Sequence, residues 1–129
     1  MTGFSADVRQ TILARSEGYC EVMAPGCDLT ATDIHHRRPR GMGGTVRPES
    51  NLAANGLAIC RPCHMRCEAM RNWARENGFV LLQADKPSFV PVWWRCGWDG
   101  GHKALVLLDD IGGKKAAALS PEIIAKAGL

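Results

Sequence analysis

Two stretches of the chain carry apolar residues at helical spacing. Residues 6–15 form the first stretch, and Gly18 follows as a stop; residues 63–77 form the second, behind Pro62 and before Gly78. Each stretch therefore predicts one amphipathic helix with a face turned to the core. The residues expected on these faces are Val8, Ile12 and Leu13 in the first helix, and Cys67, Met70, Trp73 and Ala74 in the second.

Shorter apolar runs, bounded by glycine or proline, predict strands. Pro39 ends the pairing of the first predicted strand, at 31–36, and a glycine-rich loop follows at 40–44. The alternation of helices with short strands predicts an α+β fold. Lys114, Lys115 and a helix over 120–127 are expected to form a flexible basic tail. The predicted strands are 31–36, 57–59, 78–83, 103–108 and, interrupted by prolines, 89–94.

Length and composition limit the size of the core. The chain has 129 residues, of which 46% are hydrophobic and only 6% aromatic. These numbers predict one small domain whose aliphatic core needs an additional cross-link, such as a metal site, for stability. No apolar run is long enough for a signal peptide or a membrane span, which favours the reducing cytosol. In that compartment the six cysteines are more typical of metal ligands than of disulfides.

Four of the cysteines form two pairs. Cys60 and Cys63 have the two-residue spacing typical of zinc sites, while Cys20 and Cys27 bracket a turn. Together they predict one four-sulfur structural zinc site that clamps the residues between the pairs at both ends. The alternative is a set of buried free thiols or a redox pair.

The stretch that runs into the second cysteine pair holds the strongest chemical signal. It reads HHRRPRGMGGTVRPESNLAANGLAICRPCH from His35 to His64 and contains three of the four histidines. This clustering favours an active site over isolated structural histidines. The net charge is only +3, but the basic residues gather here, which suggests an anionic partner such as nucleic acid. The arginines expected to hold phosphates are Arg37, Arg38, Arg40 and Arg47.

A histidine pair, a glycine-rich basic loop, an asparagine and CRPCH, in this order, resemble the HNH endonucleases, whose catalytic unit is a ββα-metal motif. The run HHRRPRGMGG is most similar to small HNH proteins encoded by bacteriophages and their hosts. The resemblance covers about residues 18–78. It implies a small zinc-stapled ββα-metal core, or His-Me finger, with an extra N-terminal helix and C-terminal strands. The expected division is a nuclease domain with its zinc knuckle over 1–78 and a β-rich extension with a tail over 79–129.

The resemblance also implies a role for each site residue. His35 and His64 match the two histidines that bind a divalent catalytic ion, and His36 matches the general base. Asn51 matches the middle asparagine, which holds the loop of the base by hydrogen bonds. Asn55 also fits, because its spacing to the CxxCH segment is the usual one; Asn51 is favoured because it requires no insertion before the asparagine.

Two features of this assignment remain open. Asp33 is a rival first metal ligand, because some HNH proteins use an Asp-His pair, and it is ranked second. Neighbouring His35 and His36 point to opposite faces of a regular strand. The strand must therefore bend or end there if both side chains are to reach one phosphate.

The expected function is metal-dependent hydrolysis of DNA phosphodiester bonds, with structural Zn²⁺ and a catalytic ion such as Mg²⁺, Mn²⁺, Ni²⁺ or Zn²⁺. The resemblance implies 5′-phosphate and 3′-hydroxyl products, DNA and phage packaging proteins as partners, and the cytoplasm of a bacterial host cell as location. The protein is expected to be a monomer or a dimer. The alternatives are a nicking or RNA-active HNH nuclease and a non-catalytic zinc module that binds DNA. The three clustered histidines favour a nuclease over a binding module, because DNA binding alone does not need them.

Overall fold

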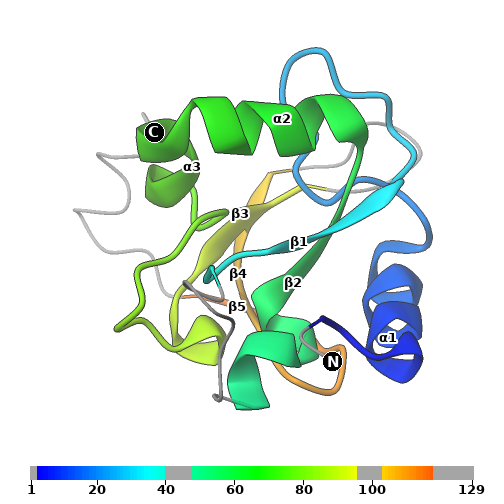
Figure 1. Cartoon of the computed structure of the whole chain (residues 1–129), viewed down its shortest axis with the longest axis vertical. Coiled ribbons are helices and arrows are strands. Elements are labelled where there is room, and N and C mark those ends of the chain that lie inside the picture. Colours follow the sequence, from blue (N-terminus) through cyan, green and yellow to red (C-terminus); the bar gives the residue numbers. More distant parts are fainter. Residues whose placement is uncertain (1–2, 40–47, 96–102, 118–129) are drawn as a thin grey trace.

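Two antiparallel strands run through the middle of the structure, and the helix that directly follows them lies along one edge (Figure 1). The structure is a computed structural model that describes residues 3–39, 48–95 and 103–117. Strand β1 (Asp33–His36) pairs with β2 (Gly56–Ile59), and His36 lies opposite Gly56. Helix α2 (Arg61–Ala69) begins after Cys60. The order strand, strand, helix is the predicted one, and both strands fall within or beside the predicted runs.

Helix α1 (Ala6–Ser16) packs beside β2 and confirms the first predicted helix. The Ser5 side chain accepts a hydrogen bond from the Val8 N–H at 3.2 Å and caps the helix start. Glu17 and Gly18 both have positive φ, of 56° and 83°, and turn the chain away from the helix axis. Of the expected core residues Ile12 is buried and Val8 is half-buried, whereas Leu13 is exposed.

The second predicted helix is interrupted at Met70. Helix α2 ends before it and α3 (Arg71–Glu76) begins after it, because Met70 has a φ of −117° and a ψ of 65°, outside the helical region. The expectation of one continuous helix with a buried Met70 is therefore wrong; Met70 is 46% exposed. Gly78 ends α3 as predicted: its φ is +80°, and a Cβ there would collide with the carbonyl of Pro91.

A second, three-stranded antiparallel sheet follows in the order β3-β4-β5. Strand β4 (Ala104–Leu108) confirms the predicted strand at 103–108, and β3 (Val92–Trp94) covers the end of the run at 89–94. The expected flexible tail is wrong at its start, because β5 (Lys114–Ala116) pairs with β4. The ammonium of Lys114 also lies 4.5 Å from the ring centroid of Trp94 in β3.

Residues 78–83 do not form the predicted strand. The backbone N–H groups of Phe79 and Val80 both donate to the carbonyl of Ala74, and that of Leu81 donates to Arg37. These bonds are directed to a helix end and a loop, and none of the strands in the described ranges pairs with the segment. Its apolar run reflects burial against the core rather than a sheet.

One main hydrophobic core joins residues from both of the expected ranges, 1–78 and 79–129. Cys20, Leu57 and Ile59 pack in the same cluster as Val92 and others from the second sheet. The two ranges therefore share one core. The predicted glycine loop at 40–44 and the predicted helix over 120–127 lie outside the described residues. Within the described part of the chain, each helix is too short or too polar to cross a membrane.

A buried ion pair ties α1 to both sheets. The Arg15 guanidinium and the Glu21 carboxylate are 0% exposed and meet at 2.7 Å. Glu21 also accepts hydrogen bonds from the backbone of Ala58 in β2 and from the indole N–H of Trp94 in β3. Because a buried carboxylate requires such partners, this network fixes the position of the chain just after Cys20.

Candidate functional site

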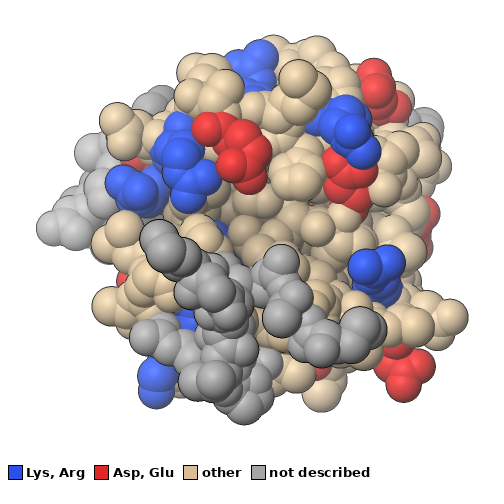
Figure 2. Space-filling model, viewed as in Figure 1, with Lys and Arg blue, Asp and Glu red and all other residues tan. Residues whose placement is uncertain are grey.

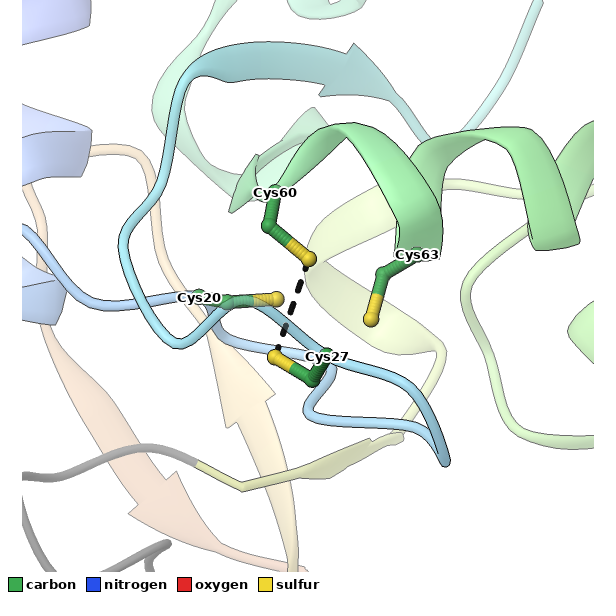
Figure 3. A group of neighbouring side chains, drawn as sticks. All are labelled: Cys20, Cys27, Cys60 and Cys63. Carbon is green, nitrogen blue, oxygen red and sulfur yellow. Dashed lines mark hydrogen bonds between the residues drawn. The ribbon is translucent and has the colours of Figure 1, made fainter.

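The four paired cysteines come together in one cluster (Figure 3). Cys20 and Cys27 approach from the loop after α1, while Cys60 and Cys63 approach from the start of α2. The four sulfur atoms lie within 4.8 Å of one another, and the Cys60 and Cys27 sulfurs are 3.6 Å apart. A tetrahedral zinc ion with its usual bond lengths needs sulfurs about 3.8 Å apart. The cluster therefore has the dimensions of a metal site.

Backbone N–H groups point at three of these sulfurs. The amides of Met23, Asp28 and Leu29 donate to Cys20, Cys60 and Cys27, at 3.4, 3.4 and 3.2 Å. Such bonds stabilise thiolate over thiol and orient the sulfurs.

The lowered pKa of Cys20 also favours a metal site. A hydrogen bond from Cys63 and further backbone N–H groups lower the pKa of Cys20 to about 5. The Cys63 thiol that donates has its pKa raised in turn. Together with the donors to the other sulfurs, this makes the cluster a candidate metal centre, as the spacing predicted.

A second polar cluster lies between β1 and α2. His35, His64 and Glu68 each offer one ligand atom, and these atoms lie within 4.8 Å of one another. They line a pocket of about 270 Å³ together with His36 and Arg71. Both neighbouring histidines thus line the same pocket, and His36 is the last residue of β1. Glu68 was missed by the sequence reasoning, although its position one turn after His64 on the same helix is a readable signal.

Hydrogen bonds fix which nitrogen of each ligand histidine carries the proton. His35 Nε2 donates to the Phe79 carbonyl at 2.8 Å, so the lone pair of His35 is on Nδ1. Burial lowers the pKa of His35 to about 4 and keeps it neutral. His64 Nδ1 lies 2.8 Å from the Asp33 carboxylate, which leaves the lone pair on Nε2. Asp33 is ionised, because hydrogen bonds from Arg61 and His64 lower its pKa to about 2.

Asp33 lies behind His64, outside the group of candidate ligand atoms. Its carboxylate contacts a histidine of the cluster and the guanidinium of Arg61, rather than belonging to the group of candidate ligand atoms. Carboxylates of this kind commonly orient a metal-binding histidine from behind and raise its basicity. Asp33 also links β1 to the first residue of α2 and so holds the two halves of the cluster together.

His36 is held from two sides. Its Nε2 donates to Asn51 Oδ1 at 3.1 Å, and its ring stacks on Phe4, with centroids 4.1 Å apart and planes 16° apart. The contact with Asn51 leaves Nδ1 as the basic nitrogen. Gly56 allows the stacking, because a Cβ there would contact the rings of Phe4 and the end of Ile12.

The two asparagines have different contacts. Asn55 is fully buried: its oxygen accepts from the Arg38 N–H at 2.7 Å, and its amide donates to the carbonyls of Arg38 and Ser50. It therefore clamps both ends of the segment between Arg38 and Ser50. The loop-holding contacts expected of Asn51 belong to Asn55, and Asn51 contacts the side chain of His36 instead.

The expected phosphate-binding role of Arg37 and Arg38 is wrong in this structure. They are 0% and 1% exposed, so they cannot meet a phosphate on the surface. The Arg37 guanidinium donates to four backbone carbonyls, and that of Arg38 donates to Asp85 and Ser50. Arg40 and Arg47 lie outside the described residues.

The drawn face mixes the two signs of charge. Figure 2 shows acidic and basic side chains side by side over the region of α2, rather than one continuous basic patch among the described residues. Ion pairs of the helix contribute to this pattern, since Arg61 pairs with Asp33 and Arg71 with Glu68. The positive charge near the pocket therefore comes from individual residues rather than from a continuous basic patch.

The fold and its two clusters define a small α+β protein with a four-cysteine candidate metal site beside a histidine pocket. The chain is similar to the "Gene 4 protein" of Mycobacterium phage D29, with 39% identity over 69 residues. The match covers 54% of this chain and 62% of that protein, so it spans less than two thirds of the phage protein's length. No family model matches the chain. No solved structure matches it either.

Proposed function

We propose that this protein is a metal-dependent endonuclease of the HNH type that hydrolyses DNA phosphodiester bonds. The observation that carries the proposal is the pocket in which His35, His64 and Glu68 offer metal ligands while His36 lies beside them, oriented by Asn51. A binding module needs neither the converging ligands nor an oriented imidazole. The β1-β2-α2 arrangement supports the same interpretation.

The donor set of the pocket fits a divalent catalytic ion. Two imidazole nitrogens and one carboxylate oxygen are typical ligands for such ions and leave coordination positions for other molecules. His35 is neutral, and Asp33 fixes the ring orientation of His64. When bound, Mg²⁺, Mn²⁺, Ni²⁺ or Zn²⁺ would supply Lewis-acid stabilisation of negative charge on the phosphate.

His36 acts as the general base in this proposal. Its Nδ1 takes a proton from the attacking water, while Nε2 remains bonded to Asn51. Asn51 and the stacked Phe4 ring limit the rotation of the imidazole, which keeps Nδ1 directed at one position. Attack by water on phosphorus then breaks the bond to the 3′ oxygen and leaves 5′-phosphate and 3′-hydroxyl ends.

The cysteine cluster has a structural role in the proposal. We assign it Zn²⁺, because four thiolates without an open position are typical of structural zinc. The ion would join the loop after α1 to the first turn of α2, which carries Cys63 and His64 on adjacent positions. Zinc binding thus positions one histidine of the pocket. The proposed setting is the cytoplasm of a phage-infected bacterial cell, with DNA as the partner.

Plasmid cleavage tests the proposal. Supercoiled DNA is incubated with the purified protein and each of the four ions, and nicked and linear products are separated on a gel. We expect cleavage by the parent and a loss of roughly 10²–10⁴ in rate for His36→Ala, with zinc content and DNA binding unchanged. His64→Ala should lose affinity for the catalytic ion, so that more of the ion partly restores cleavage.

Other outcomes would replace the proposal. Cleavage of RNA but not DNA would make the protein a ribonuclease, and nicked product alone would make it a nickase. A parent protein that binds DNA and cuts nothing with any of the four ions would be a zinc-containing binding module. A His36→Ala variant as active as the parent would move the base to another residue.

A further inference from the structure

We propose that Arg71 contacts the scissile phosphate and balances its charge during hydrolysis. The inference rests on the proposed function and adds a substrate-binding residue that neither the sequence pattern nor the candidate ligand set contains. Arg71 lines the same pocket as His35, His36, His64 and Glu68. It is therefore placed where a bound phosphodiester would lie.

Arg71 is better suited to this role than the other cation in the pocket wall. Among the described residues that line the pocket, the arginines are Arg37 and Arg71. The Arg37 guanidinium is fully buried and bonded to backbone carbonyls. The Arg71 side chain is 42% exposed, and its ion pair within the described part of the chain is long, 3.4 Å from Nη1 to the Glu68 carboxylate. A guanidinium with that exposure retains N–H groups that can bind two phosphate oxygens.

The break between α2 and α3 determines where this side chain lies. In one continuous helix Arg71 would follow the direction of the turn before it, but the chain changes direction at Met70. The side chain still reaches Glu68, three residues earlier, across that break. Arg71 thus lies at the edge of the pocket, beside the carboxylate that is a candidate ligand.

The charges of the site explain why such a cation is useful. A divalent ion contributes two positive charges, and Glu68 removes one of them; Asp33 and Arg61 cancel each other. A phosphodiester carries one negative charge, and its transition state carries two. Arg71 adds a positive charge beside Glu68 in this pocket, where it can offset the additional negative charge that the transition state develops.

The test compares Arg71→Ala and Arg71→Lys with the matched variant Arg75→Ala. Arg75 is also an exposed arginine of α3, but it does not line this pocket. Each variant is assayed at a saturating concentration of Mn²⁺ on plasmid DNA and on bis(p-nitrophenyl) phosphate, which has one phosphodiester and no flanking phosphates. Melting temperature and zinc content report on the fold.

We expect Arg71→Ala to lower kcat on both substrates by roughly 10²-fold, as removal of a transition-state donor does elsewhere. Added guanidinium ion should restore part of the activity of Arg71→Ala. The activity of Arg71→Lys should lie between those of the parent and Arg71→Ala, and Arg75→Ala should behave like the parent. Loss on DNA alone would overturn the inference, because Arg71 would then contact a flanking phosphate. Full recovery of Arg71→Ala at Mn²⁺ concentrations above the one that saturates the parent would also overturn it, because Arg71 would then act only through Glu68.

The two proposals fail in different ways. If the parent cleaves and Arg71→Ala cleaves equally well on both substrates, the inference about Arg71 falls and the proposed function stands. If the parent cleaves neither substrate with any of the four ions, both fall together.

Discussion

Replacement of Arg37 distinguishes a structural arginine from one that binds DNA. Its guanidinium donates four hydrogen bonds of 2.8–3.0 Å to carbonyls in three separate segments, and burial lowers its pKa. Arg37→Ala would leave these buried acceptors without a donor, while Arg37→Lys offers a single ammonium in place of the planar fork. The acceptors are the carbonyls of Gly78, Ala54, Pro87 and Val90.

The size of the effect follows from two opposing contributions. Each bond from a charged donor contributes roughly 1.5–3 kcal/mol, while burying the guanidinium costs several kcal/mol in return. Truncation leaves four carbonyls without this donor and opens a cavity, and we expect Arg37→Ala to lower the free energy of unfolding by about 3–5 kcal/mol. Arg37→Lys should lie at roughly half of that value, since an ammonium can satisfy some of the four carbonyls.

Urea denaturation of the zinc-loaded protein measures this loss. With a slope near 2 kcal/mol per molar urea, a loss of about 4 kcal/mol moves the midpoint by about 2 M. Arg9→Ala is the matched control on the exposed face of α1 and should change stability by less than about 0.5 kcal/mol. DNA binding by the uncharged Arg37→Ala variant, measured under conditions where it is folded, should keep the parent's salt dependence. An unchanged midpoint with a salt slope reduced by about one would refute the structural role and restore the phosphate contact.

Three further predictions concern the two clusters. Purified protein should contain about one zinc per chain, and Cys63→Ser should unfold the region around α2, as metal analysis and circular dichroism would show. Asn55→Ala should lower stability by roughly 2–3 kcal/mol through its lost buried bonds, whereas Asn51→Ala should leave stability unchanged and slow plasmid cleavage. For His35 the folded pKa of about 4 lies below the ordinary value of 6.5, so the unfolded chain binds more protons between these values. Its contribution to stability is therefore complete above pH 6.5 and is lost as the pH falls towards 4; melting curves of His35→Gln, without added divalent ion, should show a weaker dependence.

Each of these predictions has a contrary result. Zinc-free protein that stays folded would remove the structural role of the cysteine cluster. Equal loss of stability in both asparagine variants would mean that Asn51 also holds the fold. An identical pH dependence of melting in parent and His35→Gln would show that His35 is not buried in a neutral form.

Local patterns in the sequence predict the parts of this fold that depend on neighbouring residues. Helix α1 follows from apolar spacing and a serine cap, and the four-cysteine cluster follows from pair spacing alone. The break at Met70 and the pairing of β5 could not be predicted in this way, since contacts outside each segment decide them. The apolar run at 78–83 has the composition of a strand, but its amides bond to Ala74 and Arg37.

The run from His35 to Arg38 shows why composition locates a site better than it assigns roles. Four polar residues follow one another, and all four were expected at the catalytic surface. All of these residues except Arg38 line the pocket, but the guanidinium groups of both arginines are buried, because their acceptors come from segments up to 53 residues away in the chain. No local pattern contains those carbonyls. The same arginines therefore stabilise the scaffold that holds the histidines, and in our proposal the phosphate is contacted by Arg71, which follows the motif in the chain.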